Sequence, residues 1–71
     1  MEVDFVVENT NGTEYYQVAA TVRDTVTLQR ELAPLQIIHA HYPKLLLTLD
    51  EDPPDNFNGI RKVNVLDWLL Q

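Results

Sequence analysis

The sequence EVDFV at residues 2–6 and the sequence YYQVA at residues 15–19 decide the fold, because they flank an Asn11-Gly12 dipeptide. Asn-Gly between two alternating runs is the strongest short-range signal for a β-hairpin, since both residues accept the positive φ angles of a type I′ turn. We therefore expect the first twenty residues to form a hairpin.

A two-residue turn at Asn11-Gly12 would also set the register of the hairpin. Counting outward from the turn places Phe5 opposite Val18 on an apolar face. The same count places Asp4 opposite Ala19, with Gln17 diagonal to Asp4, on the more polar face. A slip by one residue would mix the two faces, so the pattern favours this register.

An amphipathic helix is expected after the hairpin, from about residue 25 to about residue 40. Asp24 is a candidate N-cap, and apolar residues follow at intervals of three to four positions: Leu28, Leu32, Leu35 and Ile38. Pro34 removes one helical hydrogen bond at a cost of ~3 kcal/mol. We therefore expect a kink near Glu31 or a short break.

Residues 44–49 (KLLLTL) form a nearly continuous apolar run, which is typical of a strand covered on both faces. A strand, a crossover helix and a second strand are ordinarily parallel, so this central strand should pair with residues 15–20. Residues 50–56 contain four acids and two prolines and are expected to form a solvated loop.

The last part of the chain predicts one more strand and a short helix. Asn58-Gly59 should form a turn into a strand at residues 60–65, and residues 67–70 should form a helical turn anchored in the core by Trp68. The predicted fold class is α/β (α+β). It comprises a β-hairpin, a crossover helix, two further strands and a short C-terminal helix, with a mixed sheet.

Seven segments resemble, in order and spacing, the C-terminal domain of a large family of bacterial and archaeal AAA+-type ATPases. They are residues 2–6, 16–18, 30–31, 42–44, 47–50, 58–60 and 65–70. The resemblance implies a partial restriction-endonuclease-like core, with residues 1–71 as one small domain, a C-terminal fragment of a larger cytoplasmic ATPase. ATP and Mg²⁺ would then be bound by the parent protein. Such a fold normally has a helix and a strand before residue 2, so the outer edge of the first strand should be exposed.

Nucleases of this superfamily use an Asp on one strand and an acid-x-Lys tripeptide on the next to bind a divalent cation and activate water. Asp4 matches the first position, but the tripeptide reads Gln17-Val18-Ala19. The Gln17 carbonyl could still bind a cation, whereas Ala19 cannot replace the lysine. We expect a vestigial site of Asp4, Gln17 and Ala19 with no catalytic residue and no metal; any metal ligands would be Asp4, Gln17 and Glu2.

Composition argues against several other classes of function. The net charge of −6 disfavours nucleic acid as a partner, because binding DNA depends on Lys and Arg. No apolar run is long enough to span a membrane. His39 and His41 are two positions apart and would point in different directions on a helix, so a joint metal site is not expected.

Three hypotheses follow. The leading one is a non-catalytic accessory or interaction domain whose partner is the remainder of the parent ATPase or a second copy. The second is a Mg²⁺-dependent nuclease in which Lys44 or Lys62 replaces the absent lysine. The third is a stand-alone protein-interaction module that pairs through an exposed strand edge.

Overall fold

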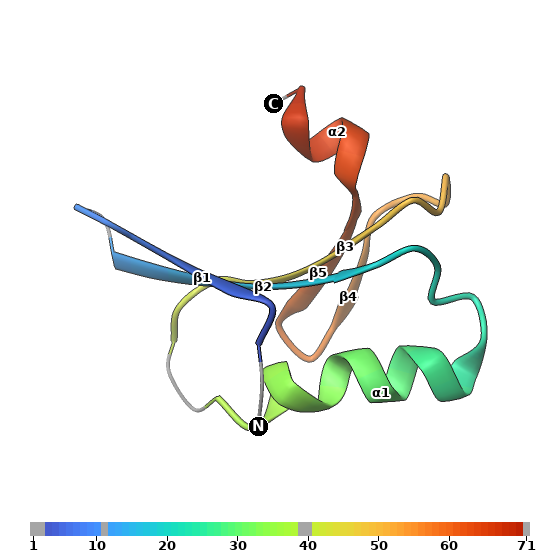
Figure 1. Cartoon of the computed structure of the whole chain (residues 1–71), viewed down its shortest axis with the longest axis horizontal. Helices are drawn as coiled ribbons and strands as arrows, with labels where there is room; N and C mark the ends of the chain where they lie inside the picture. The colour runs from blue at the N-terminus through green and yellow to red at the C-terminus, as the bar shows by residue number, and fades with distance from the viewer. Residues whose placement is uncertain (1–2, 11, 39–40, 71) are drawn as a thin grey trace.

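The computed structural model describes residues 3–10, 12–38 and 41–70. Within these residues a mixed five-stranded sheet, in the order β1-β2-β3-β5-β4, lies between two helices (Figure 1). The elements are β1 (Phe5–Asn9), β2 (Gly12–Ala19), α1 (Thr25–Gln36), β3 (Lys44–Thr48), β4 (Asp55–Phe57), β5 (Ile60–Asn64) and α2 (Val65–Leu69). The predicted α+β class with a mixed sheet is confirmed.

The centre of the sheet is parallel and its two edges are antiparallel. β2, β3 and β5 run parallel, while β1 is antiparallel to β2 and β4 is antiparallel to β5. Gln17 of β2 pairs with Leu46 of β3, so the strands joined by α1 are neighbours, as predicted. β3 is the central strand, and its leucines at positions 45, 46 and 47 are buried.

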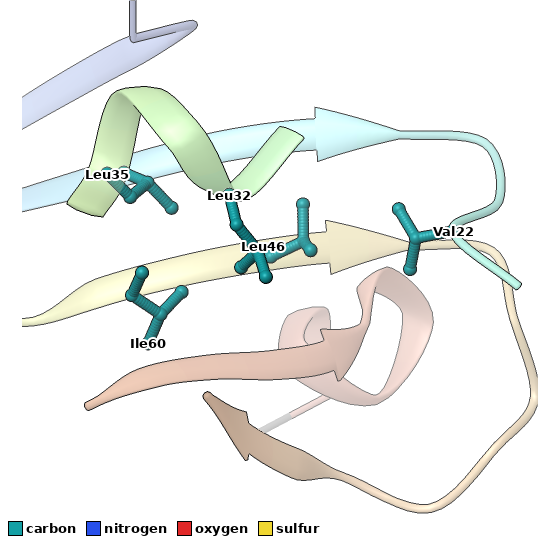
Figure 2. Close-up of a cluster of buried hydrophobic side chains, with 5 residues drawn as sticks. All are labelled: Val22, Leu32, Leu35, Leu46 and Ile60. Carbon is teal, nitrogen blue, oxygen red and sulfur yellow. The ribbon is translucent and has the colours of Figure 1, made fainter. Parts of the chain in front are cut away.

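The two helices cover opposite faces of the sheet, called here the α1 face and the α2 face (Figure 1). The core under α1 consists of Val22, Leu32, Leu35, Leu46 and Ile60 (Figure 2). The α2 face contains a second cluster of Tyr16, Leu45, Leu47 and Val63. Trp68 packs against this cluster, with its ring edge-on to Tyr16 at 5.5 Å between centroids, which confirms its predicted role as an anchor.

Helix α1 begins as predicted and ends earlier. The Asp24 Oδ2 atom accepts a hydrogen bond from the Thr27 N–H at 3.0 Å, which confirms Asp24 as the N-cap. The helix continues through Pro34 without a break and ends at Gln36, with Ile37 as the C-cap. Because proline has no N–H, the carbonyl of residue 30 lacks its helical donor, and the helix stops within the same turn.

The hairpin register differs from the predicted one by two residues. Phe5 pairs with Tyr16 rather than Val18, and Asn9 pairs with Gly12, so Gly12 belongs to β2 and not to the turn. Asn11 itself lies outside the described residues. The observed register stacks the Phe5 and Tyr16 rings at 5.1 Å between centroids and 21° between planes, which favours it over the predicted pairing. A shift of two keeps every side chain on its predicted face but changes its neighbour.

The Asn58-Gly59 turn is formed as predicted. Both residues have positive φ angles, 54° and 93°, and they connect Phe57 to Ile60. The turn also produces the short edge strand β4 within residues that were expected to be loop. The sequence Asp-Asn-Phe has no apolar alternation, so this strand depends on pairing with β5 rather than on a pattern of its own.

Candidate functional site

Asp4 and Gln17 meet where the chain enters β1. Continuing the observed register by one residue places Asp4 opposite Gln17, so the predicted pairing of Asp4 with Ala19 is wrong. The Asp4 N–H donates to Gln17 Oε1 at 2.8 Å, and Asp4 Oδ2 accepts from the Val18 N–H at 2.8 Å. Asp4 therefore uses its main chain and its carboxylate to hold β1 against β2. Glu2, the third predicted metal ligand, lies outside the described residues.

Gln17 connects this pair to the helix. Its side chain points to the α1 face, and only 6% of the residue is exposed. Gln17 Nε2 donates to Glu31 Oε1 of α1 at 3.4 Å, a long hydrogen bond. Glu31 therefore belongs to the site, although the prediction did not place it there. An available signal was its position three residues after Leu28 and four before Leu35, within the apolar stripe of the helix.

The amide of Gln17 explains how this arrangement holds together. A carboxylate at position 17 would face the Glu31 carboxylate, and two like charges at that distance repel unless a cation or a proton lies between them. The amide instead accepts a hydrogen bond from Asp4 and donates one to Glu31. The amide thus donates a hydrogen bond to Glu31, whereas an acid at this position would need a cation between the two carboxylates.

Ala19 completes the predicted tripeptide and supplies no polar side-chain atom. It is partly buried and packs against the core under α1. Among the described residues, no group of three or more His, Cys, Asp and Glu side chains is arranged to hold a metal ion. The arrangement can fasten β1 and α1 to β2; it lacks the lysine that would orient or deprotonate an attacking water.

The two lysines considered as replacements lie on neighbouring strands. Lys62 of β5 pairs across the sheet with Leu46, and its Nζ atom is 3.6 Å from Asp52 Oδ2. Lys44 begins β3 and lines a hollow with Gln36 and Ile38 at the C-terminal end of α1. Lys62 is thus engaged with the acidic loop, on the far side of β3 from Gln17.

A second polar network, missed by the sequence analysis, joins the C-terminal ends of the parallel strands. Asp50 is 5% exposed, and its carboxylate accepts from the Thr21 hydroxyl at 2.6 Å and the Val22 N–H at 3.0 Å. Asn64 Nδ2 donates to the Asp50 carbonyl at 2.9 Å, while Asn64 Oδ1 accepts from the Leu66 N–H at 2.9 Å. The network links the ends of β2, β3 and β5 to the start of α2.

Electrostatics support a structural role for this network. Hydrogen bonds from Thr21 and then Val22 hold the pKa of Asp50 below its usual range. The hydrogen bond from Arg23, at 3.1 Å from Nε to Oδ2, lowers the pKa of Asp52. The buried carboxylate of Asp50 is therefore an ionised acceptor whose partners come from the protein itself.

His41 is exposed, and His39 lies outside the described residues. Within residues 3–10, 12–38 and 41–70, neither helix has the length and apolar composition needed to cross a membrane. Comparison of the chain with protein-family models, curated proteins and solved structures finds no match.

Proposed function

We propose that this chain is a non-catalytic accessory domain of a cytoplasmic AAA+-type ATP-binding protein. In this proposal it uses a degenerate restriction-endonuclease-like scaffold for contacts with the remainder of that protein. ATP and Mg²⁺ act in the parent protein and have no site in this domain. The observation that carries the proposal is the Gln17 amide, which bonds to both Asp4 and Glu31 where a nuclease would hold a cation between acids.

The exposed apolar side chains support a role in protein contacts. Phe5, Val7 and Val18 lie on the α2 face of the hairpin and are each about two-fifths exposed, at 41%, 40% and 44%. On α2 itself, Leu66 and Leu69 are more than half exposed. Apolar residues gathered on one side of a small domain are typical of a surface that meets another protein.

A Mg²⁺-dependent nuclease is the second candidate function, because three oxygen-bearing side chains do converge. Asp4, Gln17 and Glu31 are connected by hydrogen bonds, and oxygen atoms are the ligands that Mg²⁺ prefers. This function requires a lysine, such as Lys44 or Lys62, within hydrogen-bond reach of the attacking water. It also requires Asp4 to give up its bond to the Val18 N–H.

Activity assays on the purified chain separate the two candidates. We expect no cleavage of DNA or RNA in Mg²⁺ or Mn²⁺, and no hydrolysis of ATP, beyond the background of the Asp4→Ala variant. Asp55→Ala is the matched control, because Asp55 is an exposed acid on the opposite edge strand. Metal-dependent cleavage that is lost in Asp4→Ala and retained in Asp55→Ala would overturn the proposal in favour of the nuclease.

A further inference from the structure

Strand β1 is an edge strand with nothing on its outer side in the described part of the chain. It pairs only with β2, and neither α1 nor α2 packs against it (Figure 1). The other edge strand, β4, has three residues, two of which are the polar Asp55 and Asn56. β1 is therefore the longer and more apolar of the two edges.

The main-chain groups on the outer side of β1 can be assigned from the pairing. The Tyr15 N–H donates to the carbonyl just before β3 at 2.9 Å, so odd-numbered residues of β2 direct their main-chain groups toward β3. Even-numbered residues of β2 direct theirs toward β1, where Tyr16 pairs with Phe5. Alternation along β1 then turns the N–H and C=O groups of Val6 and Glu8 outward.

Glu8 is the one charged side chain of β1, and the apolar side chains beside it do not block this edge. Phe5, Val6 and Val7 are 41%, 47% and 40% exposed, so apolar surface is present on both sides of the strand. Natural edge strands usually carry lysine, proline or a bulge that blocks pairing. β1, with the sequence FVVEN, has neither lysine nor proline.

Charge determines which kind of strand fits this edge. Residues 1–22 contain four acids, Glu2, Asp4, Glu8 and Glu14, and no lysine or arginine. A second copy of the chain would bring the same acidic hairpin against this one, with a net charge of −6 on each molecule. Complementarity therefore favours a basic partner over self-association.

We propose that the outer edge of β1 binds an extended segment of a partner protein in which apolar residues alternate with lysine or arginine. The segment adds a sixth strand by bonding to the main chain of Val6 and Glu8. Its apolar side chains lie beside Phe5 and Val7 on the α2 face, and its basic side chains lie beside Glu8 on the α1 face. The inference names the partner chemistry for the interaction role and rests on that proposed function.

Two synthetic peptides test the proposal by NMR titration of the isotope-labelled chain. The probe has the sequence Lys-Val-Lys-Val-Lys-Val and the control has Glu-Val-Glu-Val-Glu-Val, both with blocked ends. We expect the lysine peptide to bind about tenfold more tightly at low salt, with the largest amide shifts in β1, and the difference to shrink as salt is added. Glu8→Lys should reduce the preference to about twofold or less, since it removes the opposing charge.

Val6→Pro tests the edge itself. Proline removes the outward N–H of residue 6 without removing a bond to β2, whereas Val6→Thr keeps that N–H. We expect Val6→Pro to lower peptide affinity at least about fivefold and Val6→Thr to leave it within about twofold, because the added strand bonds to this main chain. If Val6→Pro does not fold, the Glu8→Lys titration decides.

Three outcomes would overturn the proposal: equal affinity for both peptides, shifts centred on β4 or α2, or a chain that already dimerises through β1 in sedimentation experiments. If neither peptide binds, this inference fails, but the expected result of the cleavage assays does not change. Cleavage dependent on Asp4, in contrast, would remove the proposed interaction role whether or not peptides bind.

Discussion

Gln17 joins three parts of the molecule through one side chain. Its amide oxygen accepts from the main chain at Asp4, and its amide nitrogen donates to Glu31 of α1, while the residue itself is almost fully buried. A buried amide that satisfies both neighbours stabilises the fold, and an acid at the same position would favour a cation more strongly than the amide does. We therefore expect an amide at position 17 to favour a structural contact and an acid there to favour a metal site.

Gln17→Glu should convert this contact into a cation-dependent one. Without divalent cations we expect the free energy of unfolding to fall by about 1–3 kcal/mol, because a donor is lost and a second carboxylate faces Glu31. Mg²⁺ should restore part of the loss. Urea denaturation in EDTA and in Mg²⁺ measures both effects, and Gln17→Glu with Glu31→Gln is the control. Unchanged stability and no response to Mg²⁺ in Gln17→Glu would contradict this view of the site.

The pKa of Tyr16 predicts a loss of folding stability at alkaline pH. Burial, and then the hydrogen bond to Glu14, raise the pKa of Tyr16 from 10.0 to about 12. Because the folded pKa is higher than the unfolded one, this contribution to stability is complete below pH 10.0 and is lost as the pH rises through about 12. Denaturant titrations at several alkaline pH values should show the loss, and Tyr16→Phe should remove it. An equally steep loss in Tyr16→Phe would show that another group is responsible.

Local sequence patterns correctly predicted those features of the helices and strands that depend on residue spacing. The N-cap at Asp24, the apolar stripe of α1 and the parallel pairing of β2 with β3 follow from spacing alone, and all three are confirmed. The hairpin register was wrong because the Asn11-Gly12 pattern placed Gly12 in the turn, whereas Gly12 begins β2. The observed register depends on the contact of Phe5 with Tyr16 across the strands.

The sequence predicted only part of the candidate site, because some of its contacts join residues that are distant along the chain. Asp4 and Gln17 were expected to be near neighbours and are, although their direct contact requires the observed register. Glu31 and Asp50 take their roles from helix packing and from strand ends that meet in the folded chain. Those contacts join residues 14 and 29 positions apart, which no local pattern encodes.

The turn between β4 and β5 offers a test of one element in isolation. Gly59 has φ +93°, and an added Cβ would meet no atom within 4 Å, so Gly59→Ala acts on the backbone alone. We expect a loss of about 1–2 kcal/mol in the free energy of unfolding, since this conformation disfavours residues with a Cβ. Asn58→Gly should change stability by less than about 0.5 kcal/mol. Equal effects of the two substitutions in denaturant titrations would contradict the assigned turn.

The pKa of Asp50, at the ends of β2, β3 and β5, predicts a loss of folding stability at acid pH. Hydrogen bonds from Thr21 and Val22 lower the pKa of Asp50 in the fold. A lowered pKa contributes stability that is complete above the unfolded value of about 3.9 and is lost as the pH falls through the folded value. Denaturant titrations below pH about 4 should show this decline. Asp50→Asn should flatten it, and Thr21→Val should weaken it; a decline unchanged by both would contradict the assignment.

In the whole molecule, closed and exposed regions of the sheet lie on different sides. α1 and the Asp50 network close one face and one end of the sheet, whereas β1 and the hairpin part of the α2 face remain exposed. The contact of Asp4, Gln17 and Glu31 lies on the closed side, on the face covered by α1. The open edge is acidic in sequence and apolar at its surface, so the proposed role requires a protein partner and not a nucleic acid.

In the proposed role, the amide of Gln17 lies where a cation would otherwise lie between Asp4 and Glu31. A Mg²⁺ titration followed by NMR signals from these three side chains tests it most directly. We predict that millimolar Mg²⁺ leaves the three signals unmoved in the unsubstituted chain, because their hydrogen bonds are already formed within the protein. Saturable shifts of all three signals that disappear in Asp4→Ala would contradict the claim and establish a metal site.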